Sequence, residues 1–355
     1  MNSLISFIAL GVFGSASAFS MTLESAKVQT YDGQSLNAFW SIPDKAPVGV
    51  VLLIQGSGNV GADGDVSGAF LGQGYKGQPA KLSENMASAL ATAGIISLRY
   101  DKRGVVDPTQ IPNQTVSNLK SDAESALAMI KARYPNLNVG IVGLSEGAFL
   151  ATQVAAEMPV KSLFLMSLFS RQIDAAFAYQ FVGWPTGLLL SHFDPTATGS
   201  ITGDQLKNAG VTTLPLTGAN WMDVDQNKDG ILSESSELFP AYQAYYSAVR
   251  GLLSTPGFHN WYQSYLPLKP FSEMAADIQS ESIFIYQGMD DAQVRWDWVL
   301  ADSVYFSVKP TLHFYSGLGH CFSPMEGVIG EIKTSGPFAD EVLQALVTDV
   351  VTGLK

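Results

Sequence analysis

The pentapeptide Gly143-Leu144-Ser145-Glu146-Gly147 could place a nucleophile in this chain. An apolar run over 139–144 precedes it and predicts a strand, and a helical pattern over 147–158 follows it. A serine at a sharp turn from strand to helix has a strained backbone that exposes its hydroxyl, and flanking glycines let neighbouring backbones approach. We therefore predict that Ser145 is a catalytic nucleophile; the alternative is a structural turn.

A serine hydroxyl needs a base, and the chain has only four histidines. His320 ends the sequence Gly317-Leu318-Gly319-His320, a flexible loop just after a predicted strand over 311–315, from which an imidazole can reach the serine. His313 falls inside that strand, which indicates packing or a buried hydrogen bond. We predict His320 as the base. The other two histidines lie outside the predicted sheet and would at most line the path of a substrate: His192 and His259.

The third partner of such a serine is a carboxylate that orients the imidazole and stabilises its charged form. A predicted strand over 282–286 is followed by two neighbouring aspartates, Asp290 and Asp291. The spacing Gly-x-x-Asp-x-x-Val, which begins at Gly288, favours Asp291. Asp290 remains the alternative, because a loop position inferred from sequence is easily offset by one residue.

Acyl transfer also needs two backbone N–H groups that bind the developing oxyanion. One is expected from Glu146, the residue after the nucleophile, and the other from Ser57 in the loop Gln55-Gly56-Ser57-Gly58. The rival interpretation of this loop is a phosphate-binding loop. Neither a GKS or GKT sequence nor a full GxGxxG follows, which argues against a nucleotide site.

Strands and helices alternate through most of the chain, which predicts a mainly parallel sheet with helices on both faces. A hairpin over 26–42, turning at Asp32-Gly33, comes first. Further strands are expected at 49–54, 95–100, 139–144, 162–168, 282–286 and 311–315. Helices are expected at 83–92, 116–133 and 147–158, near Trp296, and at 339–351.

The alternation stops after Arg171 and resumes at Ser282, so 172–280 is predicted to be an insertion into a core formed by 19–171 and 281–355. The insertion is rich in proline and aromatic residues. An aromatic segment outside the sheet favours a cap over the carboxyl ends of the strands, where ligands bind in open α/β sheets.

With these motifs, the sequence resembles the α/β-hydrolase superfamily, and more narrowly the bacterial esterases and serine aminopeptidase-like hydrolases. The matching motifs are 55–58 with Asp63-Gly64 shortly after, 99–104, 143–147, Gly288 with Asp291, and Gly319-His320. The resemblance covers about 26–170 and 281–355 and leaves out the insertion. The segment 105–108 departs from the family pattern, in which a small residue and a serine usually follow.

The resemblance implies the α/β-hydrolase fold, with a helical cap inserted after the strand that follows the nucleophile helix. It implies Ser145, Asp291 and His320 as the triad, and Ser57 and Glu146 as the donors of the oxyanion hole. It also implies that the charged loop 100–104 is structural, with its charges in a local network.

Two loops of the insertion, 31 residues apart, resemble an EF-hand pair. In the loop 225–236, oxygen-bearing side chains stand at positions one, three, five and nine, with glycine at six and an apolar residue at eight. Position twelve should be a bidentate glutamate but is Ser236, with Glu237 one residue late; Glu234 and Asp223 are possible substitutes. The expected ligands of a structural calcium ion are Asp225, Asn227, Asp229, Ile231, Ser233 and Glu237.

The other loop, 194–205, keeps the glycine and the apolar position. It has a single early carboxylate, Asp194, and Gln205 at position twelve, so its ligand field for a hard cation is weak. Calcium is therefore expected mainly in the second loop. It would brace the cap, because hydrolysis by a serine triad needs no metal cofactor.

The charge and the first residues indicate where the protein works. The chain has 20 Lys and Arg against 32 Asp and Glu, a net charge of -12, which argues against nucleic acid as a partner.

The apolar run 4–13, followed by Ala16-Ser17-Ala18, predicts a signal peptide over 1–18 and a secreted or periplasmic protein. No other segment approaches the roughly 20 apolar residues that a membrane span needs. The single cysteine, Cys321, excludes an internal disulfide.

Together these features predict an exported serine esterase that cleaves small carboxylic esters through an acyl-enzyme, with an apolar or aromatic acyl group favoured by the aromatic cap. Two alternatives stay open. A peptidase or thioesterase would use the same triad. A catalytically inactive, calcium-dependent binding protein would keep the fold without turnover.

Overall fold

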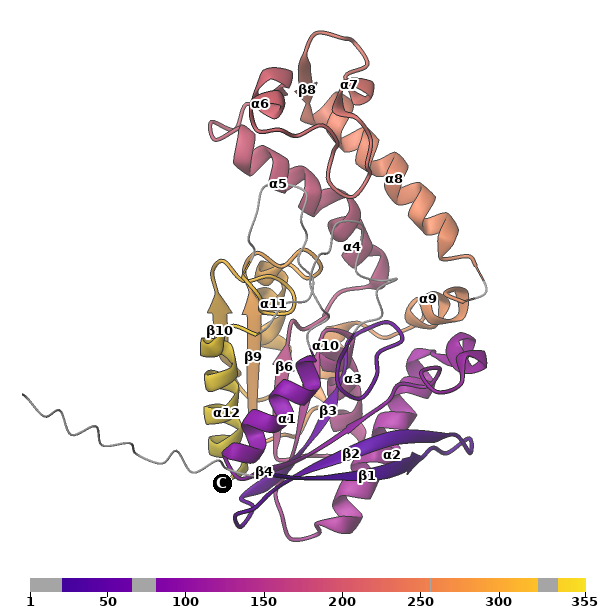
Figure 1. The fold of residues 1–355 in the computed structure, drawn as a ribbon, viewed down its shortest axis with the longest axis vertical. Helices are drawn as coiled ribbons and strands as arrows, with labels where there is room; N and C mark the ends of the chain where they lie inside the picture. The colour runs from indigo at the N-terminus through magenta and orange to yellow at the C-terminus, as the bar shows by residue number, and fades with distance from the viewer. Residues whose placement is uncertain (1–20, 66–80, 256, 325–337) are drawn as a thin grey trace, which may run out of the picture.

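The computed structural model describes residues 21–65, 81–255, 257–324 and 338–355. Its main feature is an eight-stranded sheet in the order β1-β2-β4-β3-β5-β6-β9-β10 (Figure 1). The strands are β1 (Met21–Gln29), β2 (Ser35–Pro43), β3 (Gly49–Ile54), β4 (Ile95–Tyr100), β5 (Val139–Leu144), β6 (Ser162–Met166), β9 (Ser282–Gly288) and β10 (Thr311–Tyr315). The hairpin β1–β2 pairs antiparallel with β4, and the strands from β4 to β10 run parallel.

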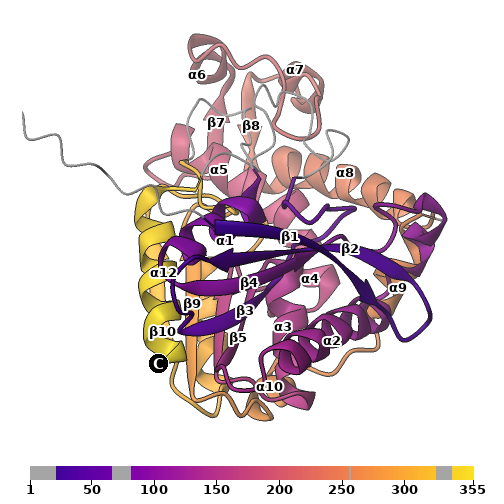
Figure 2. The same ribbon diagram turned by 60° about the horizontal axis from the view of Figure 1, so that its bottom comes forward.

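The continuous apolar runs of the sequence become strands that are covered on both faces. Every residue of β3, β4, β5 and β6 is buried. The hairpin lies at one edge of the sheet and β10 at the other (Figure 2). This confirms the predicted parallel sheet, since parallel strands need helices on both sides to exclude water from two apolar faces.

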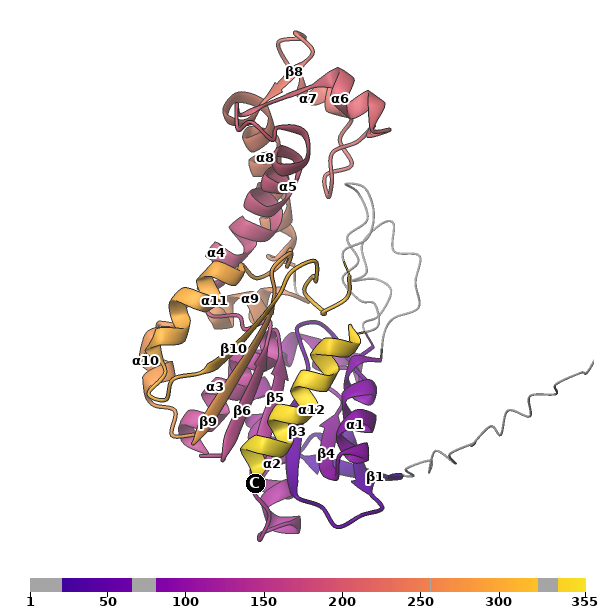
Figure 3. The same ribbon diagram turned by 90° about the vertical axis from the view of Figure 1, so that its left-hand side faces the viewer.

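Helices pack on each face of the sheet and form two apolar cores (Figure 3). One face is covered by α1 (Leu82–Thr92) and α12 (Asp340–Leu354). The other is covered by α2 (Val116–Arg133) and α3 (Glu146–Glu157), together with α10 (Phe271–Ala276) and α11 (Trp296–Asp302). A short 3₁₀ helix over Pro108–Asn113, which the sequence pattern did not predict, precedes α2.

The structure corrects one predicted boundary in a way that matters for the site. The strand expected over 162–168 ends at Met166, because Ser167 has a φ of 48° and leaves the extended conformation. This strained serine donates its hydroxyl to the backbone carbonyl of His320 at 2.7 Å. The early end of β6 therefore anchors the loop that carries the predicted base.

The insertion forms a lobe beyond the carboxyl ends of the strands (Figure 1), with a two-stranded sheet of its own, β7–β8 (Figure 2). Its elements are α4 (Ile173–Ala178), α5 (Trp184–Phe193), β7 (Ser200–Thr202), α6 (Gly203–Asn208), α7 (Trp221–Val224), β8 (Ile231–Ser233), α8 (Phe239–Leu252) and α9 (His259–Tyr265). Side chains from 182 to 246 form an apolar core that belongs to this lobe. By contrast, α9 and α10 return to the hydrolase-like core, where Tyr262, Tyr265 and Phe271 pack in one cluster with α3.

No helix in the described ranges is long and apolar enough to cross a membrane. The predicted signal peptide over 1–18 lies outside the described residues, so that export stays a prediction.

Candidate active site

Ser145 occupies the sharp turn between β5 and α3. Its backbone has φ 56° and ψ −119°, a strained conformation for a residue with a side chain. Its N–H donates to Met166 O at 2.8 Å, and its carbonyl accepts from Ala148 N at 2.9 Å, which fixes the turn between the neighbouring strand and the helix. These contacts hold the serine in the geometry that its motif predicts.

The two glycines of the motif are required by close backbone contacts. A Cβ atom on Gly143 would lie 2.3 Å from Gly147 O, and one on Gly147 would lie 2.2 Å from Ile54 O. No side chain fits at either distance without moving backbone atoms. The pattern Gly-x-Ser-x-Gly is therefore a steric condition for packing α3 against β3 and β5 at this turn.

His320 and Asp291 lie together, as the sequence predicts. His320 Nδ1 is 3.0 Å from Asp291 Oδ1 and 2.9 Å from Oδ2, and both side chains are buried. Asp290, the alternative acid, is exposed and accepts a hydrogen bond from Gly317 N at 2.7 Å. The structure thus distinguishes the neighbours: Asp291 contacts the imidazole, while Asp290 fastens the turn after β10.

Asp291 is fixed by donors around its carboxylate. Its Oδ1 accepts from the N–H groups of Gln293 at 2.7 Å and Val294 at 2.9 Å, and its Oδ2 accepts from Gln287 Nε2 at 2.9 Å. Tyr179 of the insertion donates its hydroxyl to the Asp291 carbonyl at 2.9 Å. Gln287 was missed by sequence reasoning; its signal is an amide inside the otherwise apolar strand β9, where it is 0% exposed.

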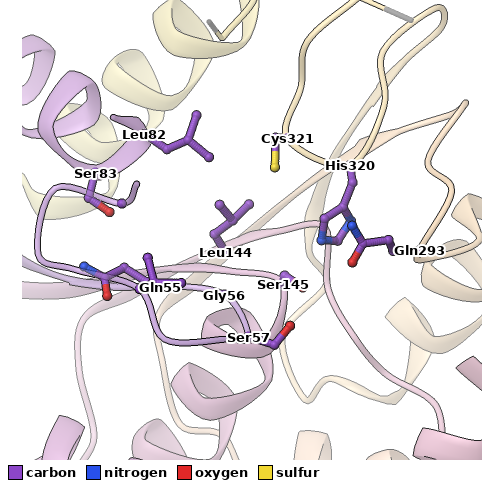
Figure 4. A pocket seen from close by; sticks show the side chains of 12 residues that line it. Gln55, Gly56, Ser57, Leu82, Ser83, Leu144, Ser145, Gln293, His320 and Cys321 are labelled. Carbon is purple, nitrogen blue, oxygen red and sulfur yellow. The ribbon is translucent and has the colours of Figure 1, made fainter. Parts of the chain in front are cut away.

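Ser145 and His320 line one cavity of about 140 Å³ (Figure 4). Its walls include Leu82, Leu144 and Cys321. Burial raises the pKa of the Cys321 thiol to about 12, with a smaller contribution from the nearby Asp291 charge, so the thiol in this wall is uncharged at neutral pH.

No direct hydrogen bond joins Ser145 Oγ to the imidazole of His320 among the contacts of the described residues. Hydrogen bonds between a nucleophile and its base are often long before a substrate binds.

The predicted oxyanion donors flank Ser145, the predicted nucleophile. A Cβ atom on Gly56 would lie 3.3 Å from Ser145 Cβ, so the backbone leading to Ser57 passes directly beside Ser145. Glu146 opens α3, where the first N–H groups have no partner within the helix. Within the described parts of the chain, the N–H groups of Ser57 and Glu146 have no hydrogen-bond acceptor. Both remain available to an oxyanion.

Lys102 connects the segments that carry these two donors, a contact that sequence reasoning did not find. Its Nζ donates to Gly56 O at 2.7 Å and pairs with Glu146 Oε2 at 2.5 Å. The Gly56 carbonyl and the Ser57 N–H belong to the same peptide group, so the ammonium both orients and polarises that donor. The resemblance implied a local charge network for 100–104, and the loop has one: Asp101 accepts from Ala62 N, and Arg103 pairs with Asp122 and Asp32.

Glu146 is a buried carboxylate that connects the nucleophile turn to the insertion. Besides Lys102, its partners are Trp261 Nε1, at 2.6 Å from Oε1, and the Tyr265 hydroxyl, both from α9. Burial alone would raise the pKa of Glu146, but the Lys102 charge and the hydrogen bonds from Lys102, Tyr265 and Trp261 lower it below the ordinary value of 4.5. Glu146 therefore stays charged at neutral pH.

Exchanging Glu146 for glutamine is expected to lower the free energy of unfolding by about 3 kcal/mol near neutral pH, because Lys102 would be left buried without its counter-charge. Since the folded pKa lies below 4.5, the stabilisation is present above that pH and is lost as the pH falls through the folded pKa. Urea unfolding at neutral and acidic pH should show a difference from the wild type that narrows below pH 4.5. A difference that does not change with pH would contradict this role.

A smaller cavity of about 60 Å³ also touches Ser145 and opens on the insertion side. Its walls include Phe169 from the core, Phe177 from α4, and Trp261 and Tyr265 from α9. Ser57 and Gln293 line both cavities. Ser145 thus lies between a compartment made by the core and an aromatic one to which the insertion contributes.

The remaining histidines lie apart from this site. His313 stacks on Tyr286 with 5.0 Å between ring centroids, and its Nε2 is 2.8 Å from Asp349 Oδ2, so it is a packed strand residue as expected. His192 lies in the last turn of α5 and His259 begins α9, and neither lines either cavity. The candidate calcium loops lie in the insertion lobe, where β7 and β8 join them.

No family model matches the chain, and no curated protein matches it in sequence. Solved structures, however, match the chain in fold. A highly thermostable carboxyl esterase from Bacillus coagulans, in complex with glycerol, superposes with a TM-score of 0.54 at 16% identity, covering 94% of this chain and 99% of that one. Est1E from Butyrivibrio proteoclasticus superposes with a TM-score of 0.52 at 14% identity, covering 93% and 98%.

A structure of Est1E with ferulic acid bound gives a TM-score of 0.51 at 13% identity, covering 92% of this chain and 98% of that chain. At these identities the similarity concerns the fold. Together with the mostly parallel sheet and its two helical layers, it shows that this chain has the α/β-hydrolase fold.

Proposed function

We propose that this protein is a serine hydrolase that cleaves carboxylic esters through an acyl-enzyme intermediate. The observation that carries the proposal is the His320–Asp291 pair, which shares a cavity with a serine on a strained strand-to-helix turn. A strained backbone persists only where the surrounding structure holds it, and such residues gather at functional sites. A structural turn alone would not need a buried imidazole and carboxylate beside it.

In the proposed reaction each of these groups has a defined role. Asp291 accepts a hydrogen bond from Nδ1–H of His320, which leaves Nε2 as the base. Nε2 takes the Ser145 proton as Oγ attacks the ester carbonyl, and the N–H groups of Ser57 and Glu146 bind the oxyanion. The imidazolium then protonates the leaving alcohol. A water molecule, deprotonated by the same Nε2, then attacks the acyl-enzyme; as the bond between the acyl carbon and Oγ breaks, the imidazolium returns the proton to Oγ, which releases the acid and restores the serine.

Lys102 acts in this proposal as a positioning residue. It touches neither the substrate nor the triad, but it fixes the peptide group that supplies the Ser57 N–H and neutralises the Glu146 side chain. Donors that are oriented before the reaction need no reorganisation when the oxyanion forms.

The charges around Ser145 favour esters over aminopeptidase substrates. Among the described residues that line the two cavities, Glu146 is the one carboxylate, and Lys102, Trp261 and Tyr265 already occupy it. An aminopeptidase needs an accessible anion for the α-ammonium group of its substrate. The described walls offer neutral amide, hydroxyl and apolar groups, which suit an uncharged ester.

The size and lining of the compartments favour a short apolar or an aromatic acyl group. A cavity of about 140 Å³ is close to the volume that holds benzene in a protein interior. The second compartment adds aromatic walls. The solved Est1E complex contains ferulic acid, an aromatic carboxylic acid, which supports an aromatic acyl group here as a proposal.

Hydrolysis of a series of nitrophenyl esters tests the function. We expect kcat/KM to be highest for acetyl to butanoyl chains, to fall steeply for long acyl chains, and to exceed the value for aminoacyl nitroanilides by orders of magnitude. Methyl ferulate serves as the aromatic substrate. Preference for the aminoacyl substrates would make the protein a peptidase, and inactivity towards all of them would favour the binding-protein alternative.

A further inference from the structure

The two EF-hand-like loops are paired about a local twofold axis. Position eight of the first loop, Ile201, pairs with position eight of the second, Leu232, in the antiparallel sheet β7–β8. Two reciprocal hydrogen bonds frame this pairing: Gly203 N donates to Gly230 O at 2.7 Å, and Glu234 N donates to Gly199 O at 2.8 Å. The insertion therefore contains two equivalent loops side by side, although their sequences differ.

The backbone of both loops turns at the same positions. Position four has a positive φ in each, 54° at Ala197 and 60° at Lys228. Position six has one as well, 74° at Gly199 and 77° at Gly230. The loop conformation is thus set by the backbone, and the difference between the loops lies in their oxygen donors.

Glu237 follows position twelve of the second loop by one residue, and a π-helical turn places it against that loop. Residues Glu234–Leu238 form this turn, in which Phe239 N donates to the carbonyl of Glu234, five residues earlier. A π turn accommodates one more residue than an α turn. Glu237 is consequently buried against the loop, where its Oε1 accepts from Gln226 N at 3.1 Å and its Oε2 from Ser233 N at 2.9 Å.

Glu234, the alternative ligand, is placed differently. It is exposed, and its Oε2 lies 3.6 Å from the position that a Cβ atom would take on Gly199 of the first loop. The structure therefore separates the two glutamates: Glu237 closes the second loop, and Glu234 reaches across to the first.

Asp225 carries an unpartnered oxygen into the second loop. The residue is 7% exposed, and its Oδ2 accepts from Gly230 N at 2.9 Å, so the carboxylate is directed across the loop. Its Oδ1 is buried and has no hydrogen-bond partner. A buried carboxylate oxygen without a partner is costly, and a bound cation would compensate it.

The first loop satisfies its own carboxylate. Asp194 Oδ1 accepts from the N–H and hydroxyl of Thr198, and its Oδ2 accepts from Gly199 N at 2.6 Å. The hydrogen bond from Thr198 N is the largest cause that lowers the pKa of the Asp194 carboxyl, and the other hydrogen bonds add to it. At position twelve, Gln205 points an amide donor at Phe193 O, at 2.7 Å. Neutral donors thus stand where a cation would need oxygen ligands.

We propose that the loop 225–237 binds one calcium ion and that its partner loop 194–205 is a metal-free brace. The ligands would be the side chains of Asp225, Asn227 and Asp229, the carbonyl of Ile231, Ser233 directly or through water, and a bidentate Glu237. The described residues contain no group of three or more His, Cys, Asp or Glu side chains already gathered for a metal. The site is instead a mixed set of three carboxylates and three neutral oxygens, in which the exposed Asp229 accepts from Ile231 N at 2.8 Å.

Calcium suits this set better than magnesium. Calcium accepts six to eight oxygen ligands in flexible geometry, including backbone carbonyls and bidentate carboxylates, whereas magnesium demands a near-ideal octahedron. The ion would fasten β8 to the start of α8, whose Tyr242 and Tyr246 pack in the core of the insertion lobe. This proposal does not depend on the proposed hydrolase activity.

Isothermal titration of the chelator-treated protein with calcium chloride tests the proposal. We expect one calcium ion per chain with a dissociation constant between about 10⁻⁷ and 10⁻⁴ M, and no displacement by magnesium at the same concentration. Calcium should also raise the melting temperature. Asp229→Asn, an exposed and nearly isosteric change, should weaken binding about tenfold or more while leaving the melting temperature without calcium unchanged.

Matched variants decide which residues hold the ion. Glu237→Gln should weaken binding about tenfold or more, whereas Glu234→Gln and Asp194→Asn should retain both the affinity and the single site. Absence of stoichiometric calcium binding in the wild type would overturn the proposal. Two ions per chain would overturn the assignment of a metal-free first loop, and loss of binding in Glu234→Gln alone would overturn Glu237 as the closing ligand.

Discussion

Replacing Ser145 by alanine is expected to reduce kcat/KM for nitrophenyl esters by a factor of about 10⁴ or more. The variant loses the oxygen atom that forms the acyl-enzyme in the proposed mechanism, and removal of the nucleophile from a serine triad leaves little more than the contribution of the oxyanion hole and binding. The steady-state rates of the wild type and Ser145→Ala, measured on the ester that the wild type cleaves best, provide the comparison.

The melting temperature of Ser145→Ala serves as the control for folding. Because the alanine keeps a Cβ atom at the same strained φ of 56°, we expect the fold and the cavity to remain. A well-folded variant with more than about a hundredth of the wild-type rate would contradict nucleophilic catalysis by Ser145.

The second large effect separates two neighbouring acids. Asp291→Asn is expected to lower kcat by about 10⁴, because an amide can donate to Nδ1 of His320 and so favour the tautomer that protonates Nε2. Asp290→Asn is expected to lower it less than about tenfold, because Asp290 contacts Gly317 N and has no contact with the imidazole.

This pair of variants has the same chemical change at adjacent positions, so general effects on the loop are shared. The ratio of the two kcat values is the measured quantity. Equal losses, or a larger loss in Asp290→Asn, would show that the His320–Asp291 contact at 2.9 Å does not set the tautomer during turnover.

The features that could be predicted from sequence are those governed by local rules. The continuous apolar runs gave β3 and β5, and the spacing of Ser145, Asp291 and His320 relative to the strand ends indicated residues that the fold then brings together. Parallel strands bring their carboxyl ends to one edge of the sheet, so side chains far apart in the sequence meet there.

The network around Glu146 could not be predicted in this way. Its partners come from the loop after β4 and from α9, and neither lies at a characteristic spacing from residue 146. A lysine and a glutamate in a sequence usually indicate a solvated surface, since charged residues are rarely buried unless they are paired. Only the fold shows that Lys102 and Glu146 form a buried pair.

The late glutamate of the second loop shows a similar limit. Position twelve of the pattern is Ser236, so the motif by itself left the ligand open among Glu237, Glu234 and Asp223. The π-helical turn that contains Glu237 continues directly into α8, and Leu238 and Tyr242 of these two segments are buried in the core of the insertion lobe. The position of a residue in the twelve-residue motif therefore does not show by itself which glutamate is buried against the loop.

Covalent labelling with a fluorophosphonate, which reacts with activated serines, tests most directly whether Ser145 is the nucleophile. Intact-mass and peptide-mass analysis should find one phosphonyl group per chain, located on Ser145, with loss of esterase activity in proportion to labelling. Ser145→Ala should stay unlabelled. An esterase that remains fully active without being labelled, or a label on another residue in the inactivated enzyme, would contradict the proposal that Ser145 is the nucleophile.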